Sequence, residues 1–293
     1  MHKSGFVNII GNPNVGKSTL MNALVGERLS IITSKAQTTR HRIMGIVSGE
    51  DFQIVYSDTP GILKPSYKLQ ESMMKFVTGA VTDADVILYV TDTVERSDRS
   101  AEIIERISRS GIPTIVVINK IDLSTPEALD ALVERWQAEI PGARIVPVSA
   151  KENFNVEGLF RTILELLPEG PAFYPKDTLT DKTLRFFASE IIREKILRNY
   201  DKEIPYSCEI EIEEYREEPG IDRISAVIYV ARNSQKGILI GHKGEKLKKV
   251  GRQAREELEE FLRKKVFLQL FVKVSEDWRN DQRQLRRFGY DPQ

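Results

Sequence analysis

The sequence predicts two domains in series, an α/β domain with a mainly parallel sheet covered by helices on both faces, and then a smaller α+β domain. Over the first 150 residues, short runs rich in Val and Ile alternate with helical patterns. This rhythm is typical of buried parallel strands joined by crossover helices. Beyond residue 180 the order changes to α-β-β-α-α-β. A length of 293 residues agrees with about two domains.

The strands of the first domain are expected where the apolar runs are short and bounded by turn residues. They are Phe6–Ile10, Gln53–Tyr56, Val86–Thr91, Thr114–Asn119 and Ile145–Val148, and a helix over Val156–Leu167 closes the domain. The next segment, Leu167–Pro175, holds three prolines and a glycine. Neither a helix nor a central strand accommodates that pattern. We therefore expect the first domain at 1–170, a linker at 171–180 and the second domain with its C-terminal tail at 181–293.

The elements of the second domain are predicted from the places where the spacing of apolar residues changes between the helical and the strand period. They are a helix at Asp181–Asn199, strands at Ser207–Tyr215 and Ile224–Ala231, a short helix into Gly241, a long helix at Glu245–Lys265 and a strand at Val266–Val274. Most of the residues Phe261, Phe267, Leu268, Phe271 and Val272 are expected in the core of the last helix and strand rather than on an aromatic stacking platform. The tail from Trp278 to Tyr290 mixes arginines with aromatic residues, and its role stays open.

Composition limits the classes of protein. Hydrophobic residues make up 41% and charged residues 29% of the chain, which fits a globular protein. The 43 basic and 43 acidic residues balance, so a nucleic acid or a membrane would have to bind a local patch. A single cysteine, Cys208, excludes an internal disulfide, and no Cys/His spacing suits structural zinc. Met1–Gly11 has no secretory signal and no apolar run is long enough to span a membrane, so we expect a cytoplasmic protein.

Residues 11–18 match the phosphate-binding pattern G-x-x-x-x-G-K-[ST] and lie between a strand and the helix Thr19–Leu24. In this context the loop N–H groups and the helix N-terminus bind phosphate oxygens. Lys17 is expected to reach the β- and γ-phosphates, and the Ser18 hydroxyl to ligate Mg²⁺. The candidate nucleotide contacts of this loop are Asn12, Asn14, Val15, Gly16, Lys17, Ser18 and Thr19.

Two further segments carry candidates for the γ-phosphate and the metal. Asp58 follows the strand Gln53–Tyr56, where its carboxylate can hold Mg²⁺ through water, and the Gly61 N–H is available to the γ-phosphate. Between the first helix and the next strand, Thr39 is the preferred Mg²⁺ ligand and γ-phosphate sensor, with Thr38 as the alternative. We therefore expect the metal to be held by Ser18, Thr39 and Asp58, and catalysis to depend on Lys17, Thr39 and Gly61.

The base is predicted to be guanine. Asn119-Lys120-Ile121-Asp122 ends one strand, and Ser149-Ala150-Lys151 ends the next. Asp122 can accept the two N–H donors of a guanine edge, which adenine lacks, and a buried carboxylate left unpaired would reject ATP. The backbone of Ser149, Ala150 and Lys151 can donate to the guanine O6. Together with the phosphate loop, these residues indicate GTP and GDP as the ligands.

This ordered set of motifs resembles the GTPase domains related to translation factors, over about residues 5 to 168. The resemblance implies that Asn119 supports the base site and that the stem of Lys120 packs on the base. Ile62 stands where Ras-like enzymes carry a glutamine that orients the attacking water, so slow intrinsic hydrolysis or help from another group is expected. Asn14 occupies the position at which similar GTPases without that glutamine bind K⁺; its other reading is stabilisation of the loop backbone.

The second domain carries Gly241-His242-Lys243-Gly244 between a short apolar helix and a long basic one. It resembles a type II KH domain, whose G-x-x-G loop clamps the backbone of about four nucleotides. From Arg232 to Arg252 there are seven basic residues and one acidic residue, which favours a phosphate-binding surface over an ordinary solvated helix. The candidate RNA contacts are Lys236, Ile240, Gly241, His242, Lys243, Gly244, Lys246 and Lys249.

Taken together, the two domains resemble the bacterial Era family of GTPases, of the TrmE-Era-EngA type, over nearly the entire chain. The resemblance implies a monomer that binds 16S rRNA near its 3′ end, rather than DNA, and acts in assembly of the 30S ribosomal subunit. It also implies peripheral association with the cytoplasmic side of the inner membrane, for which the sequence carries no anchor.

Other classes of function stay open at this point. One is an RNA-modification GTPase, which needs a catalytic cysteine or a cofactor motif, and Cys208 in a predicted strand is a poor candidate. Another is a constitutive RNA-binding scaffold whose nucleotide site only stabilises the fold. An ATPase is disfavoured by Asp122. The switch that we expect instead orders Thr39 and the segment Asp58 to Gly61 when GTP and Mg²⁺ bind, and makes the KH groove available to RNA.

Overall fold

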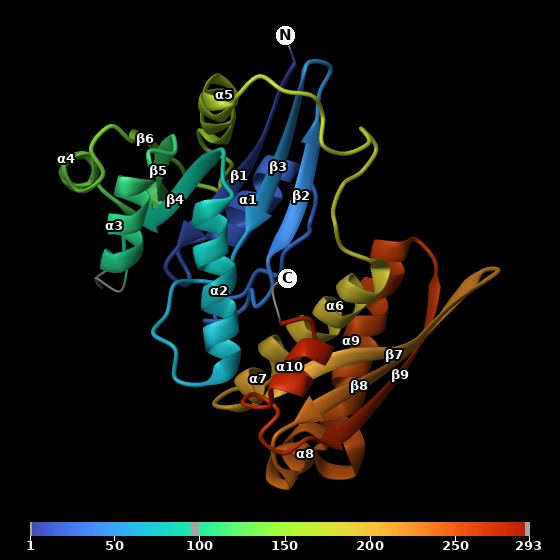
Figure 1. Cartoon of the computed structure of the whole chain (residues 1–293). Helices are drawn as coiled ribbons and strands as arrows, with labels where there is room; N and C mark the ends of the chain where they lie inside the picture. Colours follow the sequence, from blue (N-terminus) through green and yellow to red (C-terminus); the bar gives the residue numbers. More distant parts are fainter. Residues whose placement is uncertain (1, 95–99, 291–293) are drawn as a thin grey trace. The chain divides into compact units, whose positions relative to one another are not determined.

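The computed structural model describes residues 2–94 and 100–290. These residues divide into two compact units, residues 2–66 with 70–181 and residues 67–69 with 182–290 (Figure 1). Within the described ranges, every helix is too short or too polar to pass through a bilayer.

The first unit is built on a six-stranded sheet with the order β2-β3-β1-β4-β5-β6. All neighbouring pairs are parallel except β2 and β3, which are antiparallel. The mainly parallel sheet is thus confirmed, but β2 was not predicted, because a glycine at its centre interrupts a short apolar run. The strands are β1 (Lys3–Gly11), β2 (Ile43–Ser48), β3 (Phe52–Asp58), β4 (Val86–Asp92), β5 (Thr114–Asn119) and β6 (Arg144–Pro147).

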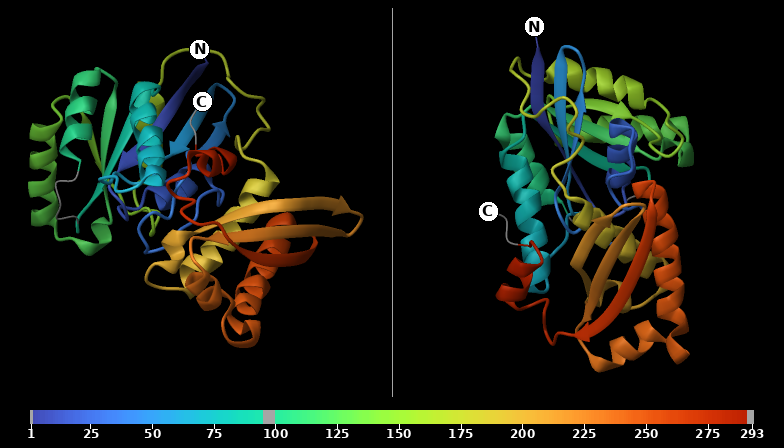
Figure 2. Two further views of the ribbon diagram at one scale, coloured as in Figure 1. Left: turned by 60° about the horizontal axis from the view of Figure 1, so that its bottom comes forward. Right: turned by 90° about the vertical axis from the view of Figure 1, so that its right-hand side faces the viewer.

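Helices cover both faces of this sheet (Figures 1 and 2). On one face, α1 (Lys17–Val25) packs on β1, β2 and β3 and against α5 (Val156–Leu166). On the other, α2 (Lys68–Thr82), α3 (Ala101–Ser110) and α4 (Pro126–Glu139) form a core with β1, β4 and β5. A short 3-10 turn, η1 (Ile121–Leu123), follows β5. The carboxyl ends of the parallel strands therefore meet at one edge, which is where ligands bind in such sheets.

The segment predicted as a linker is attached to the first unit. The Gln53 side-chain oxygen accepts the N–H groups of Phe173 (2.7 Å) and Tyr174 (2.9 Å), and its amide nitrogen donates to Tyr174 O (2.8 Å). Further along, the Ile46 N–H donates to Leu179 O (2.8 Å) next to an antiparallel bridge between Gly45 and Thr180. Residues 179–181 thus lie along the free edge of β2, and residues 173 and 174 are held by Gln53 on β3.

The second unit has a three-stranded sheet in which β7 and β8 are antiparallel and β8 and β9 are parallel. Helices α6, α8 and α9 lie over one face of this sheet, around a core that includes Ile192, Leu239, Val250 and Ala254 (Figure 2). The predicted order of elements is confirmed. The elements are α6 (Leu184–Asn199), α7 (Ile204–Ser207), β7 (Cys208–Glu218), β8 (Ile221–Val230), α8 (Asn233–Ile240), η2 (His242–Gly244), α9 (Glu245–Leu262), β9 (Lys265–Val274) and α10 (Gln282–Arg287).

The prediction that most of five residues near the end of the second domain belong to the core holds for Val272 and Leu268. It was wrong for Phe261, Phe267 and Phe271, whose exposed fractions are 40%, 43% and 48%. Alternate residues of a strand point to opposite faces. Helices α6, α8 and α9 cover one face of this sheet, while α10 contacts the other face at Glu211 and Tyr229. Leu268 and Leu270 lie on the covered face and pack against the core, whereas the phenylalanines of β9 lie on the other.

The C-terminal tail packs on the second unit. Trp278 and Tyr290 are buried; the Trp278 indole donates to Ser207 O (3.0 Å), and the Tyr290 hydroxyl donates to Glu209 (2.6 Å). Arg287 pairs with Glu211 on β7 (2.5 Å). At least this arginine of the tail therefore has an intramolecular partner.

Candidate functional site

The phosphate-binding loop joins β1, which ends at Gly11, to α1, which begins at Lys17. Gly16 has a φ of 94°, and a Cβ atom at this position would lie 2.2 Å from the Asn119 side-chain nitrogen. Only glycine can therefore bring the loop backbone this close to β5. The turn places the N-terminus of α1, with its unsatisfied N–H groups, at the mouth of the site.

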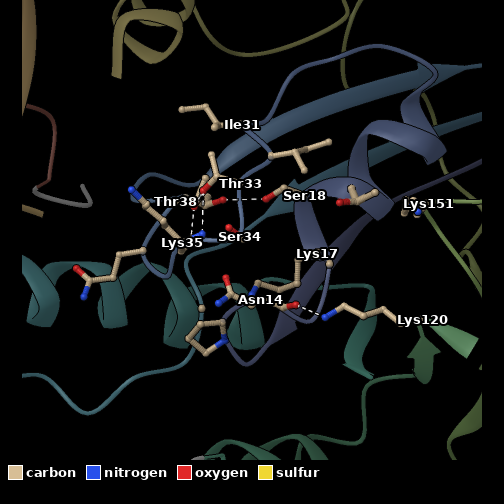
Figure 3. A pocket seen from close by; sticks show the side chains of 17 residues that line it. Asn14, Lys17, Ser18, Ile31, Thr33, Ser34, Lys35, Thr38, Lys120 and Lys151 are labelled. Carbon is tan, nitrogen blue, oxygen red and sulfur yellow. Dashed lines mark hydrogen bonds between the residues drawn. The ribbon is translucent and has the colours of Figure 1, made fainter. Parts of the chain in front are cut away.

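A cavity of about 440 Å³ opens above this loop (Figure 3). It is lined by most of the nucleotide contacts that the sequence predicts: Asn14, Gly16, Lys17, Ser18, Thr19, Thr39, Gly61, Lys120 and Lys151. Asn12 and Val15 are buried within the loop. The Lys17 ammonium donates to Gly11 O (3.1 Å) and Asn12 O (2.8 Å), so it lies folded across the loop.

Two hydroxyls and a carboxylate converge beside Lys17. The Ser18 hydroxyl donates to Asp58 (2.7 Å) and lies 2.9 Å from the Thr39 hydroxyl, which in turn lies 3.3 Å from the same Asp58 oxygen. The Thr38 hydroxyl instead donates to Lys35 O (2.6 Å) and lies 2.7 Å from the Thr33 hydroxyl. Of the two threonines, Thr39 is the one that the fold brings to Ser18 and Asp58.

These groups fit a magnesium ion. Hydroxyl and carboxylate oxygens are the hard ligands that Mg²⁺ prefers, and the second carboxylate oxygen of Asp58 is buried and has no hydrogen bond of normal geometry among the described residues. Burial raises the pKa of Asp58, while the Lys17 charge and the nearby hydroxyls of Ser18, Ser30 and Thr39 oppose this rise. A cation beside Asp58 would stabilise the charged carboxylate in the same way as Lys17 does.

The residues predicted for the base meet at the ends of β5 and β6. Asn119 ties the segments together, because its side chain donates to Val15 O (2.9 Å) and accepts the Ala150 N–H (3.0 Å). Asp122 accepts the Ser149 hydroxyl (2.5 Å). The expectation that Asp122 is buried was wrong, since η1 presents it at the surface.

Lys120 projects from the end of β5 over the phosphate-binding loop. Its ammonium donates to Asn14 O (2.6 Å), an interaction drawn in Figure 3, and pairs with Asp92 (2.5 Å) at the end of β4. Sequence reasoning missed Asp92. Its position at the carboxyl end of a predicted parallel strand was the available signal.

Sequence reasoning also missed most of the loop between α1 and β2. Asn22 on α1 fixes the start of this loop, since its side chain accepts the N–H groups of Leu29 and Ser30 (each 3.0 Å) and donates to Ser30 O (2.9 Å). The remaining residues of the loop that line the cavity are Ile31, Ile32, Thr33, Ser34, Lys35, Gln37 and Thr38.

Ile62 is 2% exposed and packs in the core with Ile10 and Val77. Its backbone N–H donates to Gly11 O (3.1 Å), which holds the segment after Gly61 against the phosphate-binding loop. An apolar side chain directed into the core cannot orient a water molecule in the cavity.

The G-x-x-G loop of the second unit projects its main chain into solvent. Gly241, Lys243 and Gly244 have φ values of 73°, 46° and 79°, and α9 begins directly afterwards. His242 and Lys243 are exposed, as are Lys246 and Lys249 on the first turns of α9. The last two predicted contacts, Lys236 and Ile240, are partly buried, and Ile240 packs against the core.

A phosphate loop, a metal-binding edge and a guanine-type base site on one parallel sheet define a P-loop GTPase domain, and a G-x-x-G loop between α8 and α9 defines a KH domain. Comparison with known families agrees with both assignments: residues 6–120 match the family described as 50S ribosome-binding GTPase, and residues 203–279 match the KH domain.

The chain belongs to the Era family of GTPases. It is 44% identical to the GTPase Era of Alkaliphilus metalliredigens over 295 aligned positions, covering 99% of both chains. It is also 44% identical to the GTPase Era of Staphylococcus haemolyticus over 99% of this chain and 97% of that one. The chain is therefore a GTPase that binds GTP and GDP, and the ATPase alternative is excluded.

Solved structures agree over the full length. A crystal structure of Era in complex with MgGDPNP and nucleotides 1506–1542 of 16S ribosomal RNA matches with a TM-score of 0.96 at 41% identity, covering 100% of both chains. A variant of Aquifex aeolicus Era bound to GDP·AlF4⁻ matches with a TM-score of 0.95 at 41% identity, covering 99% of this chain and 100% of that one.

Proposed function

We propose that this chain is a GTP-driven switch that binds 16S rRNA near its 3′ end and acts in assembly of the 30S ribosomal subunit. The observation that supports this most is the full-length match to Era bound to a GTP analogue and 16S RNA, together with a nucleotide cavity and a G-x-x-G loop in this chain. A match to the GTPase domain alone would support GTP binding but not RNA binding.

Residues of the cavity bind the phosphates of GTP, and residues at the ends of β5 and β6 bind the base. The loop N–H groups from Asn14 to Thr19 and the Lys17 ammonium bind the phosphates, and Lys17 exchanges its carbonyl partners for phosphate oxygens. Asp122, held by the Ser149 hydroxyl, accepts the guanine N–H donors. The backbone of Ala150 and Lys151 donates to the guanine O6.

Ser18 and Thr39 would hold Mg²⁺ through their hydroxyls and Asp58 through water; when bound, the ion neutralises charge on the β- and γ-phosphates. Thr39 reports the γ-phosphate because it belongs to a loop, whereas Ser18 and Asp58 lie on α1 and β3. The Gly61 N–H donates to the γ-phosphate. After hydrolysis both contacts to that group are lost, which releases the loop.

Hydrolysis must proceed without a glutamine beside Gly61, because Ile62 is part of the core. Asn14 lines the cavity with a φ of 66°, and its side chain is our candidate K⁺ ligand. The chemistry that K⁺ supplies when bound is positive charge at the phosphates in place of an arginine finger. GTP turnover that is faster in KCl than in NaCl at equal ionic strength supports this; equal turnover removes it.

The KH loop binds RNA through its main chain and its charge. The left-handed Gly241 and Gly244 let phosphates approach the backbone, and Lys243, Lys246 and Lys249 supply positive charge at the start of α9, where the helix N-terminus also favours anions. The RNA-modification alternative has little support, since Cys208 is fully buried and is the only cysteine of the chain.

A ribosomal partner implies a cytoplasmic location, and we include that location in the proposal. Peripheral association with the inner membrane, the monomeric state and the absence of DNA binding stay predictions from the family resemblance.

The proposal is tested by binding of the full-length protein, loaded with a GTP analogue and Mg²⁺, to a labelled RNA with the 3′-terminal sequence of 16S rRNA. Gly244→Asp places a negative charge at the loop, where a Cβ meets nothing within 4 Å, and should reduce RNA affinity at least about tenfold. Gly220→Asp is the matched control, because Gly220 also has a positive φ and open space but lies in the turn between β7 and β8. Equal loss of RNA binding in both variants, or no loss in either, contradicts the proposal.

A further inference from the structure

Asp92 is the last residue of β4 and lies next to the Asn-Lys-x-Asp motif of the nucleotide site. It is paired with Asn119 across β4 and β5, so the parallel register places it beside the first residue of the Asn-Lys-x-Asp motif. Its side chain is 5% exposed and makes an ion pair of 2.5 Å with the Lys120 ammonium.

Contacts on both sides fix this pair. The other carboxylate oxygen of Asp92 accepts the Val94 N–H (3.0 Å), which sets the orientation of the carboxylate. The Thr93 hydroxyl donates to Lys120 O (3.0 Å). The segment from Asp92 to Val94 therefore holds Lys120 by its backbone as well as by its side chain.

Lys120 needs this support, because its side chain is long and 31% exposed and its backbone is in the left-handed region at a φ of 61°. The two partners, Asp92 and Asn14 O, together direct the lysine stem across the mouth of the base site. Without the Asp92 carboxylate, the Lys120 ammonium would keep only the Asn14 carbonyl as a partner. The Lys120 side chain would then also populate rotamers that point into solvent.

We propose that Asp92 is a positioning residue for guanine nucleotides: it holds Lys120 in the orientation that packs on the base, and so it sets how long GDP and GTP stay bound. This rests on the proposed binding of GTP and on the contact between Lys120 and the base that the family resemblance implies. Because Lys120 contacts the base end of the site, Asp92 acts equally on GDP and on GTP and leaves the Mg²⁺ dependence unchanged.

The test measures dissociation of a fluorescent GDP and a fluorescent GTP analogue from the full-length protein. Asp92→Ala should speed both dissociation rates about tenfold, as expected when one partner of a charged hydrogen bond is removed. Asp92→Asn keeps the shape and one hydrogen-bond acceptor and should lie between Asp92→Ala and the wild type. Glu165→Ala, which removes an exposed ion pair with Arg144 in the same unit, is the control and should leave both rates unchanged.

A double-mutant cycle separates positioning from mere support of the fold. If Asp92 acts through Lys120, adding Asp92→Ala to Lys120→Ala changes the dissociation rates no further. The inference is overturned if the two substitutions raise the dissociation rate independently, so that their effects multiply in the double variant. It is also overturned if Asp92→Ala dissociates within twofold of the wild-type rate while Lys120→Ala dissociates much faster. An unchanged rate for Lys120→Ala overturns the proposed role of Lys120 and the inference with it, and this result is distinct from the other two.

Discussion

At the scale of single residues, two adjacent threonines with the same side chain have different environments. The Thr39 hydroxyl meets Ser18 and Asp58, whereas the Thr38 hydroxyl closes a turn with Lys35 O. The chemistry of the loop between α1 and β2 therefore depends on which hydroxyl the backbone turns inward.

We predict that Thr39→Ala lowers GTP turnover about a hundredfold, because a ligand that stabilises the phosphate charge is lost. GDP affinity should stay near wild type, since GDP lacks the γ-phosphate. Thr38→Ala, the matched variant, loses hydrogen bonds within the loop and should change turnover less than about fivefold. Comparable losses in the two variants, measured by phosphate release, would show that Thr39 has no special role.

The same scale shows what the sequence could and could not predict about the site. Lys17, Ser18, Asp58 and Asn119 were predictable because their motifs are local and their spacing follows from a strand and a turn. The position of Asp92 near the end of a predicted strand was visible in the sequence, but its pairing with Lys120 was not, since that depends on the register between β4 and β5, which only the folded sheet sets.

At the scale of elements, the segment between the domains is hydrogen-bonded to the edge of the sheet in the first unit. Gln53 on β3 binds the backbone of Phe173 and Tyr174, and β2 is bridged to Thr180. Since β2 directly follows the loop that carries Thr39, that loop is connected to this segment through the hydrogen bonds between β2 and residues 179–181.

Gln53→Ala removes the side-chain partners of these backbone groups, and we predict a local loss of stability of about 1–3 kcal/mol. Hydrogen exchange should speed up at the amides of Phe173 and Tyr174 while the amides of β5 keep their protection. Gln269→Ala on β9, in the second unit, is the control. Unchanged exchange at residues 173 and 174 would mean that Gln53 does not hold the segment.

The tail gives a second prediction at this scale. Trp278 is fully buried and donates to Ser207 O, so Trp278→Ala should cost about 3–5 kcal/mol and expose the amides of β7 and β8 to exchange. Phe271→Ala, in a residue 48% exposed, should cost much less. Equal exchange in the two variants would contradict a structural role for the tail.

The helices and strands with the most regular hydrophobic pattern were the ones predicted most accurately from the sequence. The bounds of the apolar β5 and the first residue of the long α9 were predicted correctly, because strong patterns and, for α9, the preceding Gly244 mark them. The end of α9 was predicted at Lys265, whereas the helix ends at Leu262. β2, α7 and α10 were missed: they are short, and tertiary packing rather than local propensity stabilises them. The exposed phenylalanines of β9 were misassigned because a strand pattern alone does not say which face of the sheet is covered.

At the scale of the whole molecule, the chain joins a GTPase domain that binds GTP and GDP to a KH domain. A nucleotide can change RNA affinity only if the GTP-bound and GDP-bound states differ in their free energy of binding RNA. This difference is the central claim of the proposed switch.

The most direct measurement is the affinity of the full-length protein for the 3′-terminal 16S RNA in the presence of Mg²⁺, with a GTP analogue and with GDP at equal salt. The account predicts RNA binding at least about tenfold tighter with the analogue, a coupling of about 1.4 kcal/mol. It also predicts that the difference disappears in Gly244→Asp and persists in Gly220→Asp. Equal RNA affinity in the two nucleotide states would contradict the switch and leave a constitutive RNA-binding GTPase in its place.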